Sequence, residues 1–554
     1  MLRGSFLQSI QKRYRSQKHN SVLFVNSDKS IDLDRYMRPT NYRSLAREFD
    51  QYFVDSNLLN DDSYLYKKMN LSCAFYRDYY QMYYTIVQYN SLLRLIETGE
   101  EIVIRVGDPY LRRALSVYRQ RGFKNVKIYG YHYQIFKNIA SEVVKLSLNF
   151  TTLLRHPLFL FSSKKCAVHT SNNFGPTGKF DYRIGDVVAP LIKGRAPLLF
   201  LIRTTHGPLK IIKNHFLREV PCIYTDSIIK VCDFIARSIS VFIGIGGNLE
   251  GGIKHHIVFD RLSHGVSGTR LAISTLGSLF QRLNISVMFC PDSSERSILE
   301  LAACKQRGIT TIGGQNGGEW DFFQVHKFVK PVSVGLEYMA HDKFGVWSEG
   351  WLQYFVRNSK VYSKENLYVS GFYRHKAKPY KALDGPNKKI DKILWLVENL
   401  TPVNEIFPYI EILIKNNVII YLKVRPQQKD AGDLTAEKIM QKFGCENFRV
   451  IDQPIEDCIH DFDLALGSYT TALLDAGLQG VPVLVLKTDT WGDVFELEFD
   501  QTVNRSYCRS PKELIDGICD VPLEAIQNFI NLYAPAPHLS GSEWVIKEIN
   551  NNLK

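Results

Sequence analysis

Apolar residues in the last third of the chain form short continuous runs that alternate with amphipathic stretches. The runs lie at residues 393–397, 418–424, 448–451, 463–466 and 482–486, and helical patterns lie at 407–415, 434–443 and 471–479. Continuous apolar runs are typical of strands that are buried on both faces of a parallel sheet. The alternation therefore predicts a doubly wound parallel sheet of the Rossmann type.

The first two thirds of the chain show the same rhythm with more interruptions. Strand patterns lie at residues 22–25, 102–106, 126–129, 198–202, 220–224, 286–290 and 310–312, and a tyrosine-rich helical pattern lies at 64–97. A chain of 554 residues is too long for one core. We therefore expect an α/β fold in which two doubly wound Rossmann-type domains face each other across a cleft.

The composition of the chain predicts its domain boundaries. A stretch rich in proline and lysine at residues 376–391 has no apolar period and predicts a linker. The expected units are a basic lead segment (1–20), an N-terminal α/β domain with insertions (21–375), the linker (376–391), a C-terminal Rossmann-like domain (392–535) and a C-terminal helix (536–554).

The charge of the chain favours anionic partners. The formal net charge is +13, and five basic residues precede the first acid: Arg3, Lys12, Arg13, Arg15 and Lys18. This segment is either a short amphipathic helix on an anionic membrane surface or a frayed basic tail. No apolar run is long enough for a spanning helix or a secretory signal. We expect a cytoplasmic protein that can lie on the inner face of the cytoplasmic membrane.

Neither the cysteines nor a DxD motif predicts a metal site. The ten cysteines are scattered and form no CxxC pair, which argues against a zinc knuckle or a redox dithiol and fits a reducing cytoplasm. Asp461 and Asp463 form a DxD, but they lie directly before a buried strand. We therefore interpret Asp463 as a structural residue and expect no bound metal.

A turn rich in hydroxyl groups follows the strand at residues 463–466. The strand ends in Gly467, and Ser468, Thr470 and Thr471 stand at the start of the next helix. Hydroxyl side chains at this position cap helices, and the free N–H groups of a first turn bind anions. The turn is therefore either an ordinary helix cap or a phosphate site.

Residues 365–490 together resemble the donor domain of the GT-B glycosyltransferases that build bacterial surface polymers. These include the CDP-glycerol-type polymer transferases, the bacterial sialyl- and polysialyltransferases and the Kdo transferases of capsule synthesis. Their pattern has a basic motif after one strand, here Lys423 and Arg425, and a Ser/Thr-rich turn after a later one. The resemblance implies a set of donor-binding residues: Lys423, Arg425, Ser468, Tyr469, Thr470, Thr471 and Asp475.

Two positions of this pattern bear on how the phosphate and the ribose of the donor are bound. Arg425 stands where the family has histidine, and because arginine keeps its proton it can hold phosphate charge but cannot act as an acid. Asp475 matches an acidic position that accepts ribose hydroxyls in many GT-B enzymes. A solvated helix carboxylate is the alternative for Asp475.

A looser resemblance covers residues 285–320. The glycine-rich turn after the strand at 310–312 resembles a turn that lines the cleft in the polymer transferases, and residues 369–374 resemble the crossing point before the linker. The resemblance implies a set of cleft-lining residues: Gln315, Asn316, Gly317, Gly371 and Arg374.

The catalytic carboxylate is expected in the N-terminal domain. Glu319 in the glycine-rich turn is the first candidate, and Asp292 after the strand at 286–290 is the second. Glu319 can instead cap a helix that starts near Trp320. Glu250 is a third acid, in a glycine-rich stretch like the start of a dinucleotide fingerprint. No clear helix follows that stretch, so NAD is not expected.

These features lead to one main hypothesis and three alternatives. The chain is expected to be a metal-independent glycosyltransferase without a cofactor, which adds a sugar to a bacterial surface glycan of the lipopolysaccharide or capsule kind. A CMP-activated acidic sugar is the preferred donor, a glycan or lipid-linked molecule the acceptor, and nucleic acid is not a partner. The alternatives are polyol-phosphate transfer from a CDP donor, epimerisation of a sugar nucleotide, and a non-catalytic basic glycan-binding protein.

Overall fold

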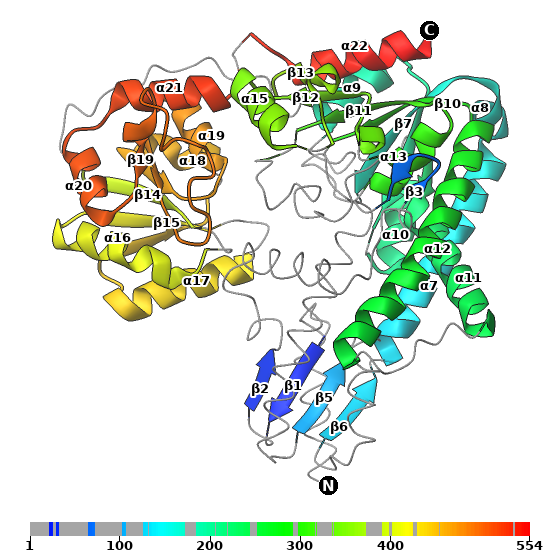
Figure 1. Ribbon diagram of the computed structural model, residues 1–554, viewed down its shortest axis with the longest axis horizontal. Coiled ribbons are helices and arrows are strands. Elements are labelled where there is room, and N and C mark those ends of the chain that lie inside the picture. The colour runs from blue at the N-terminus through cyan, green and yellow to red at the C-terminus, as the bar shows by residue number, and fades with distance from the viewer. Residues whose placement is uncertain are drawn as a thin grey trace.

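The computed structural model describes residues 21–25, 29–32, 65–71, 102–106, 126–130, 132–171, 184–204, 206–218, 220–243, 252–291, 297–315, 317, 335, 337–359, 361–372, 390–397, 401–424, 429–453, 455–535 and 538–554. These residues form a seven-stranded, a six-stranded and a four-stranded sheet and a short hairpin. The seven-stranded sheet with its helices is the first domain, and the six-stranded sheet with its helices is the second (Figure 1).

The sheet of the first domain is parallel throughout. Its strands are β7 (Lys165–Ser171), β8 (Leu198–Arg203), β9 (Cys222–Tyr224), β10 (Ile285–Cys290), β11 (Thr310–Gly314), β12 (Lys343–Val346) and β13 (Leu367–Val369). They lie in the order β13-β12-β11-β10-β7-β8-β9. The chain therefore builds outward from β7 to β9, returns to the centre and builds outward on the other side. The order reverses between β7 and β10, as in a doubly wound sheet.

Both faces of this sheet are buried, which explains its continuous apolar runs. In β8, Phe200 and Ile202 belong to one core cluster, and Leu199 and Leu201 belong to the other. Helices α9 (Gly185–Lys193), α10 (Pro208–Phe216) and α22 (Gly541–Leu553) contribute to the first cluster, and α12 (Gly252–Arg282) and α13 (Ile298–Gln306) contribute to the second. The domain also contains α7 (His132–Arg155), α8 (Pro157–Ser162), α11 (Thr225–Ile243) and α15 (Glu349–Asn358).

The sheet of the second domain is built in the same way. Its strands are β14 (Lys392–Leu396), β15 (Ile419–Lys423), β16 (Phe448–Ile451), β17 (Leu464–Gly467), β18 (Val483–Leu486) and β19 (Tyr507–Cys508). They lie parallel in the order β16-β15-β14-β17-β18-β19, which reverses between β14 and β17. Its helices are α16 (Val403–Lys415), α17 (Lys429–Phe443), α18 (Ile455–Cys458), α19 (Ala472–Leu478), α20 (Pro511–Cys519) and α21 (Leu523–Tyr533).

The predicted fold class, α/β with two doubly wound Rossmann-type domains, is confirmed by these two strand orders. Each strand predicted in the last third overlaps an observed strand, from β14 to β18. Strands β7, β12, β13 and β19 were not predicted. They are short or carry polar and glycine residues, as in Lys-Phe-Gly-Val of β12, and so lack a continuous apolar run.

The N-terminal strands form a sheet of their own. β1 (Ser21–Val25), β2 (Lys29–Asp32), β5 (Ile102–Val106) and β6 (Val126–Gly130) lie in the order β2-β1-β5-β6. β1 is antiparallel to β2 and β5, whereas β5 and β6 are parallel. The apolar pattern located β1, β5 and β6, but a pattern does not tell which sheet a strand joins.

Two local predictions were wrong. Residues 65–70, predicted as helix, form a hairpin of β3 (Leu65–Tyr66) and β4 (Met69–Asn70), while residues 72–97 lie outside the described part. Lys67 and Lys68 both have positive φ, the geometry of a tight hairpin turn, which no glycine signals here. The second error is the missing helix after Glu250, because α12 starts at Gly252 and packs against α11 and α13.

The two domains meet at α15 and α21. Trp351 of α15 donates a hydrogen bond of 2.9 Å from Nε1 to the carbonyl oxygen of Tyr533, and the hydroxyl of Ser348 donates one of 2.7 Å to the carbonyl oxygen of Leu532. A Cβ on Gly350 would lie 2.3 Å from that same oxygen of Leu532. The first turn of α15 is therefore in close contact with the end of α21.

The chain leaves the first domain and returns to it at one place. Gly371, with φ +82°, lies on the way out, and Gly541 lies on the way back. The amide of Gly541 donates a hydrogen bond of 2.8 Å to the carbonyl oxygen of Phe372, and a Cβ on Gly541 would lie 2.5 Å from the carbonyl oxygen of Gly371. Helix α22 then packs on β7, β10 and β11 of the first sheet.

Candidate functional site

The carboxyl edge of the second sheet carries polar side chains where the strand order reverses. Thr401 follows β14 and Ser468 follows β17, and their hydroxyl oxygens lie 3.4 Å apart, both buried. Lys423 ends β15, on the other side of β14, and its ammonium donates to the carbonyl oxygen of Val424 at 3.3 Å. Doubly wound sheets bind nucleotides in the crevice beside such a reversal. Two hydroxyls and one lysine are thus brought to the position where this fold binds ligands.

The hydroxyl-rich turn caps α19 through Thr470, one of the three residues expected there. Thr471 is the N-cap residue of α19, but its side chain makes no capping hydrogen bond. Instead, the hydroxyl of Thr470 accepts a hydrogen bond of 3.3 Å from the amide of Ala472. Because α19 has seven residues, we assign no separate anion site to its N-terminus.

The other predicted donor residues have different surroundings. The ring of Tyr469 stacks on Trp491 with the centroids 4.0 Å apart and is 8% exposed. Asp475 is half-buried on α19. Arg425 follows β15 directly but lies outside the described residues. The structure therefore brings Ser468 and Lys423 to one edge and holds Tyr469 mainly in a ring stack.

Asp463 has the structural role that its position predicts. One of its carboxylate oxygens accepts hydrogen bonds from the amides of Asp391, at 3.0 Å, and Lys392, at 2.9 Å. The carboxylate thus pins the start of β14 against the start of β17. Among the described residues, no group of three His, Cys, Asp or Glu side chains could hold a metal ion.

At the carboxyl edge of the first sheet, Gln315 is buried and tied to its neighbours. Its amide nitrogen donates to the carbonyl oxygen of Gly317 at 3.0 Å, and its amide oxygen accepts from the backbone of Trp347 at 3.0 Å. Gln315 therefore holds the end of β11 against the start of α15. The remaining predicted residues, Glu319, Asp292, Asn316 and Arg374, lie outside the described part of the chain.

A buried ionic cluster that the sequence did not reveal lies at the same edge. Glu300 on α13 is fully buried and accepts two hydrogen bonds of 2.8 Å from Arg203, the last residue of β8. Thr225, directly after β9, donates a third of 2.6 Å. His169 of β7 lies 4.0 Å from the same carboxylate. One carboxylate thus connects the carboxyl ends of three adjacent strands.

The charge of Glu300 is maintained by its neighbours. Burial alone would raise the pKa of this carboxyl, but the charges of Arg203 and His169 and the hydroxyl of Thr225 together lower it below its usual value. Arg203 leaves 24% of its side chain exposed, so the guanidinium links this buried cluster to the solvent-facing edge of the sheet. The Nε and Nη2 groups of Arg203 are both engaged by Glu300, so the fork serves the buried carboxylate.

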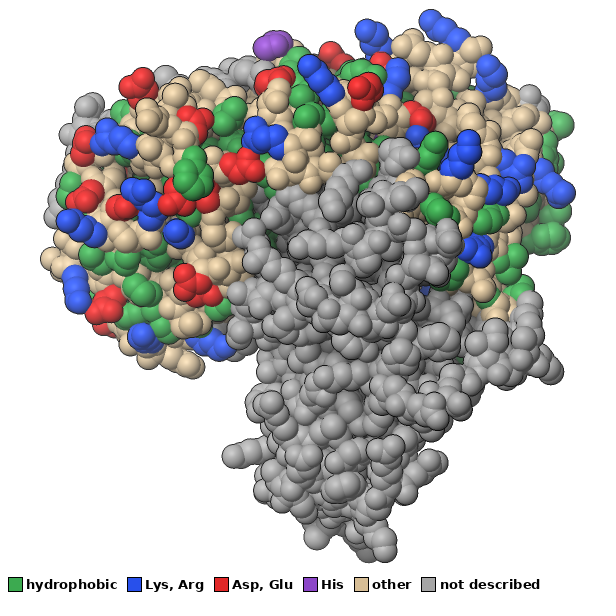
Figure 2. Space-filling view, in the orientation of Figure 1, with side chains coloured by type: hydrophobic (Ala, Val, Ile, Leu, Met, Phe, Trp, Pro, Cys, Tyr) green, Lys and Arg blue, Asp and Glu red, His purple; other side chains and the backbone are tan. Residues whose placement is uncertain are grey.

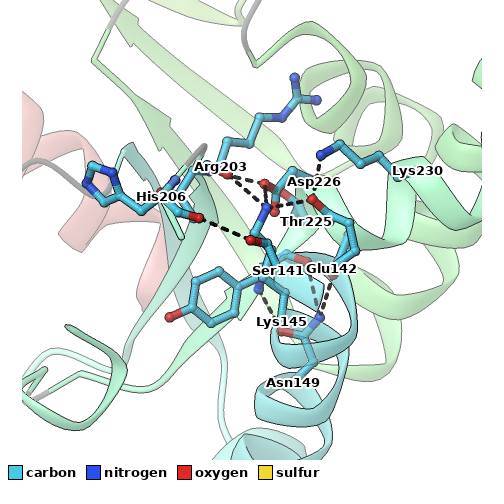
Figure 3. A network of polar contacts seen from close by, with 12 residues as sticks. Ser141, Glu142, Lys145, Asn149, Arg203, His206, Thr225, Asp226 and Lys230 are labelled. Carbon is cyan, nitrogen blue, oxygen red and sulfur yellow. Dashed lines mark hydrogen bonds and ion pairs between the residues drawn. The ribbon is translucent and has the colours of Figure 1, made fainter. Parts of the chain in front are cut away.

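A second polar network adjoins the cluster (Figure 3). The side chain of Lys145 on α7 is 1% exposed, and its ammonium donates to Asp226 at 2.5 Å and to the carbonyl oxygen of Thr204 at 2.8 Å. Burial raises the pKa of Asp226, and the charge of Lys145 opposes that rise. Glu142 accepts from both Lys145 and Lys230 at the outer end of the network. The network fixes α7 and the first turn of α11 to the ends of β8 and β9.

Two of the missed residues had a signal in the sequence. Arg203 directly follows the predicted strand at 198–202, and Thr401 follows the one at 393–397 after a gap of three residues. Polar residues at these ends mark the functional edge of a parallel sheet. Glu300 had a weaker signal, as a single acid among the apolar residues Ile298, Leu299 and Leu301.

No family model and no curated protein matches this chain. Several solved structures are similar to it. MurG of Acinetobacter baumannii is 11% identical over 70% of this chain and 99% of its own, with a TM-score of 0.42. The UDP-GlcNAc 2-epimerase of Neisseria meningitidis, bound to UDP-GlcNAc, is 10% identical over 70% and 100%, with a TM-score of 0.40. The lipopolysaccharide outer core galactosyltransferase WaaB is 10% identical over 70% and 99%, with a TM-score of 0.38. These likenesses are weak, and the fold assignment rests on the strand orders of the two sheets.

Proposed function

We propose that this chain is a GT-B-like glycosyltransferase that moves a sugar from a nucleotide-activated donor onto a growing bacterial surface glycan. The observation that carries the proposal is the pair of hydroxyls of Thr401 and Ser468 at the reversal of the second sheet, with Lys423 one strand away. Backbone amides, hydroxyls and a lysine at such an edge provide the donors that a diphosphate or monophosphate needs. The resemblance of residues 365–490 to donor domains of surface-polymer transferases supports the same assignment.

A CMP-activated acidic sugar is the proposed donor. The families that residues 365–490 resemble use CMP or CDP carriers, and the net charge of +13 favours an acidic sugar and an acidic acceptor. Arg425 in place of the family histidine keeps its charge at every working pH, so it stabilises the leaving phosphate without giving up a proton. We expect the reaction to need no bound metal and no further cofactor.

On the acceptor side, we propose Glu319 as the catalytic base and Asp292 as the second candidate. Asp292 follows β10, which borders the reversal of the first sheet. Loss of a general base costs about 10²–10⁴-fold in turnover while donor affinity stays nearly constant. We therefore expect Glu319→Gln to reduce kcat in this way. If Asp292→Asn loses turnover and Glu319→Gln does not, the role belongs to Asp292, and if neither does, this assignment of the acceptor side is wrong.

The proposal is tested first by nucleotide binding and then by product analysis. The rise in melting temperature with CMP, CDP, UDP and GDP identifies the base and the phosphate number, and we expect CMP to give the largest rise. Incubation with the corresponding nucleotide sugar, with and without a glycan acceptor, then separates the reactions. Transfer appears only with acceptor, whereas an altered sugar nucleotide without acceptor identifies an epimerase. Binding of none of these nucleotides would refute the proposal.

A further inference from the structure

Helix α7 buries polar side chains and exposes apolar ones, which is the reverse of the usual arrangement. The side chains that it buries are mostly polar: Ser141, Lys145, Asn149 and Thr152 are at most 8% exposed. The side chains that it turns outward are apolar and recur at helical spacing: Ile139, Val143, Leu146, Phe150 and Leu154 are between 38% and 64% exposed. We call these five residues the apolar face of α7.

The inward polarity follows from what α7 covers. β9 is an edge strand, and Asn149 pairs with Tyr224 of β9, accepting from its amide at 2.7 Å and donating to its carbonyl oxygen at 3.1 Å. Thr152 donates to the carbonyl oxygen of Cys222 at 3.0 Å. An edge strand needs hydrogen-bonding partners, which apolar side chains do not provide. The apolar side of the helix is therefore left facing outward, and its side chains belong to neither core cluster of the described residues.

The apolar face continues onto the neighbouring helices. Leu158 of α8 and Leu209 of α10 are each 83% exposed, and Phe216 at the end of α10 is 58% exposed. The guanidinium of Arg155, the last residue of α7, lies 5.6 Å from the centre of the Phe216 ring and so joins α7 to α10. Single exposed apolar residues are ordinary, but a contiguous set on adjoining helices marks an interaction surface.

Most charged side chains around this surface are basic. Arg155, Lys210 and Lys213 are exposed, and Glu142 is the only acid in residues 139–164 and 206–218. Glu142 is already paired with Lys145 and Lys230. In Figure 2, acidic side chains gather over the left-hand and upper parts of the visible face, whereas Lys, Arg and hydrophobic side chains dominate its right-hand part. An apolar face with a basic border is complementary to an anionic lipid surface.

We propose that the outward faces of α7, α8 and α10 dock on an anionic phospholipid membrane. The apolar side chains enter the interface, and Arg155, Lys210 and Lys213 contact lipid phosphates. A second copy of the chain fits the surface less well, because self-association would bring two basic borders together. No helix in the described part of the chain is long and apolar enough to cross a membrane, and docking of this kind requires none. The proposal does not depend on the chemistry of the active site.

The first test measures co-sedimentation of the full-length protein with vesicles. Vesicles of mixed phosphatidylglycerol and phosphatidylcholine are compared with vesicles of phosphatidylcholine alone. The double variant Phe150→Gln/Leu154→Gln keeps good helix formers in α7 and is expected to bind the anionic vesicles at least tenfold more weakly. The matched control, Phe499→Gln/Val450→Gln, removes exposed apolar side chains from the second domain and is expected to bind like the parent protein. Equal binding of the two variants would overturn the proposal.

The second test separates lipid charge, the N-terminal segment and self-association. Neutralising Lys210 and Lys213 to Gln is expected to weaken binding about fivefold for each charge, with the loss confined to anionic vesicles. Removal of residues 1–19 is expected to leave the effect of the α7 variant in place. The proposal fails if the truncation alone abolishes vesicle binding while the α7 variant binds vesicles as well as the parent protein does. It also fails if the parent protein does not bind vesicles and sedimentation shows that it forms a dimer, whereas the α7 variant is a monomer.

Discussion

Arg203 holds Glu300 through two parallel hydrogen bonds, from Nε to Oε1 and from Nη2 to Oε2, each 2.8 Å long. The two residues are 97 positions apart in the chain and come from opposite sides of the strand-order reversal. Because Glu300 is fully buried, its charge depends on this fork and on Thr225. The carboxyl edge of the first sheet is thus organised around one ionised carboxylate.

Replacement of Glu300 by Gln should lower the stability of the first domain relative to the parent protein. The loss should be larger at neutral pH than in acid. A carboxyl whose pKa is lowered by folding stabilises the native state above the pKa of the unfolded chain, near 4.3, and this contribution is lost as the pH falls through the folded value. Breaking a buried pair costs about 3–5 kcal/mol. The melting temperatures of both proteins at pH 7 and at pH 3 measure this difference.

The control for this prediction is Glu411→Gln. Glu411 pairs with Lys415 one turn away on the exposed face of α16, and such exposed pairs contribute little to stability. Its melting temperature should follow that of the parent protein at both pH values. If Glu300→Gln behaves in the same way, the cluster at the edge of the first sheet does not depend on the carboxylate charge.

Gly371→Ala should destabilise the return of the chain to the first domain. The position has φ +82°, which costs an L-residue about 1–2 kcal/mol, and a Cβ there would lie 2.9 Å from the Cβ of Leu539. We expect a lower melting temperature and faster hydrogen exchange in α22. Gly185→Ala is the control, because a Cβ there meets nothing within 4 Å. Equal exchange in the two variants would show that the crossing tolerates a side chain.

Arg425→Ala should weaken nucleotide binding by about 1.5–3 kcal/mol, the loss of a charge-assisted contact to phosphate. Calorimetric titration with the nucleotide that raises the melting temperature most measures the change. Arg449→Ala is the control, since Arg449 is an exposed arginine on β16 of the same domain that bonds to backbone carbonyl oxygens. Unchanged affinity of the Arg425 variant would remove this residue from the donor site.

Asn149→Ala should expose the edge of the first sheet. It removes the two hydrogen bonds to the backbone of Tyr224 and leaves buried polar groups without their partner, at about 1–3 kcal/mol. Hydrogen exchange of a peptide around residue 224 should accelerate. Ser147→Ala removes only a hydrogen bond from an exposed hydroxyl to its own helix, so the exchange rate of that peptide should not change. No difference between the two variants would contradict the role of Asn149 at the edge.

The fold could be predicted wherever a strand is buried on both faces, as in Leu-Leu-Phe-Leu-Ile of β8, because its side chains are apolar without interruption. The prediction failed or was silent where backbone geometry or a contact distant in sequence decides the structure. The hairpin at 65–70, predicted as helix, depends on backbone geometry at Lys67 and Lys68. Helix α7 was not predicted, and its direction depends on the edge of β9. A periodic pattern identifies α7 as amphipathic but does not tell which side faces the core.

The candidate site could be predicted only in part for the same reason. Ser468 stood out because it follows a strand directly within a run of hydroxyl residues, and Lys423 because it ends a strand. Their relation to Thr401 required the strand order, which places β14 between β15 and β17. The Glu300 cluster joins residues from α13, β7 and β8 and the start of α11, and no local spacing connects them.

The return of α22 to the first sheet affects the order in which the protein folds during synthesis. Val545 and Ile549 of α22 share a core cluster with Phe200 of β8, yet the whole second domain is translated between them. Domains usually fold in the order in which the ribosome makes them. Here the second domain can finish while one face of the first sheet still waits for residues 541–553. Translation that stalls before this helix would therefore leave a completed second domain beside an uncovered apolar sheet, and chaperones would have to protect the earlier part of the chain.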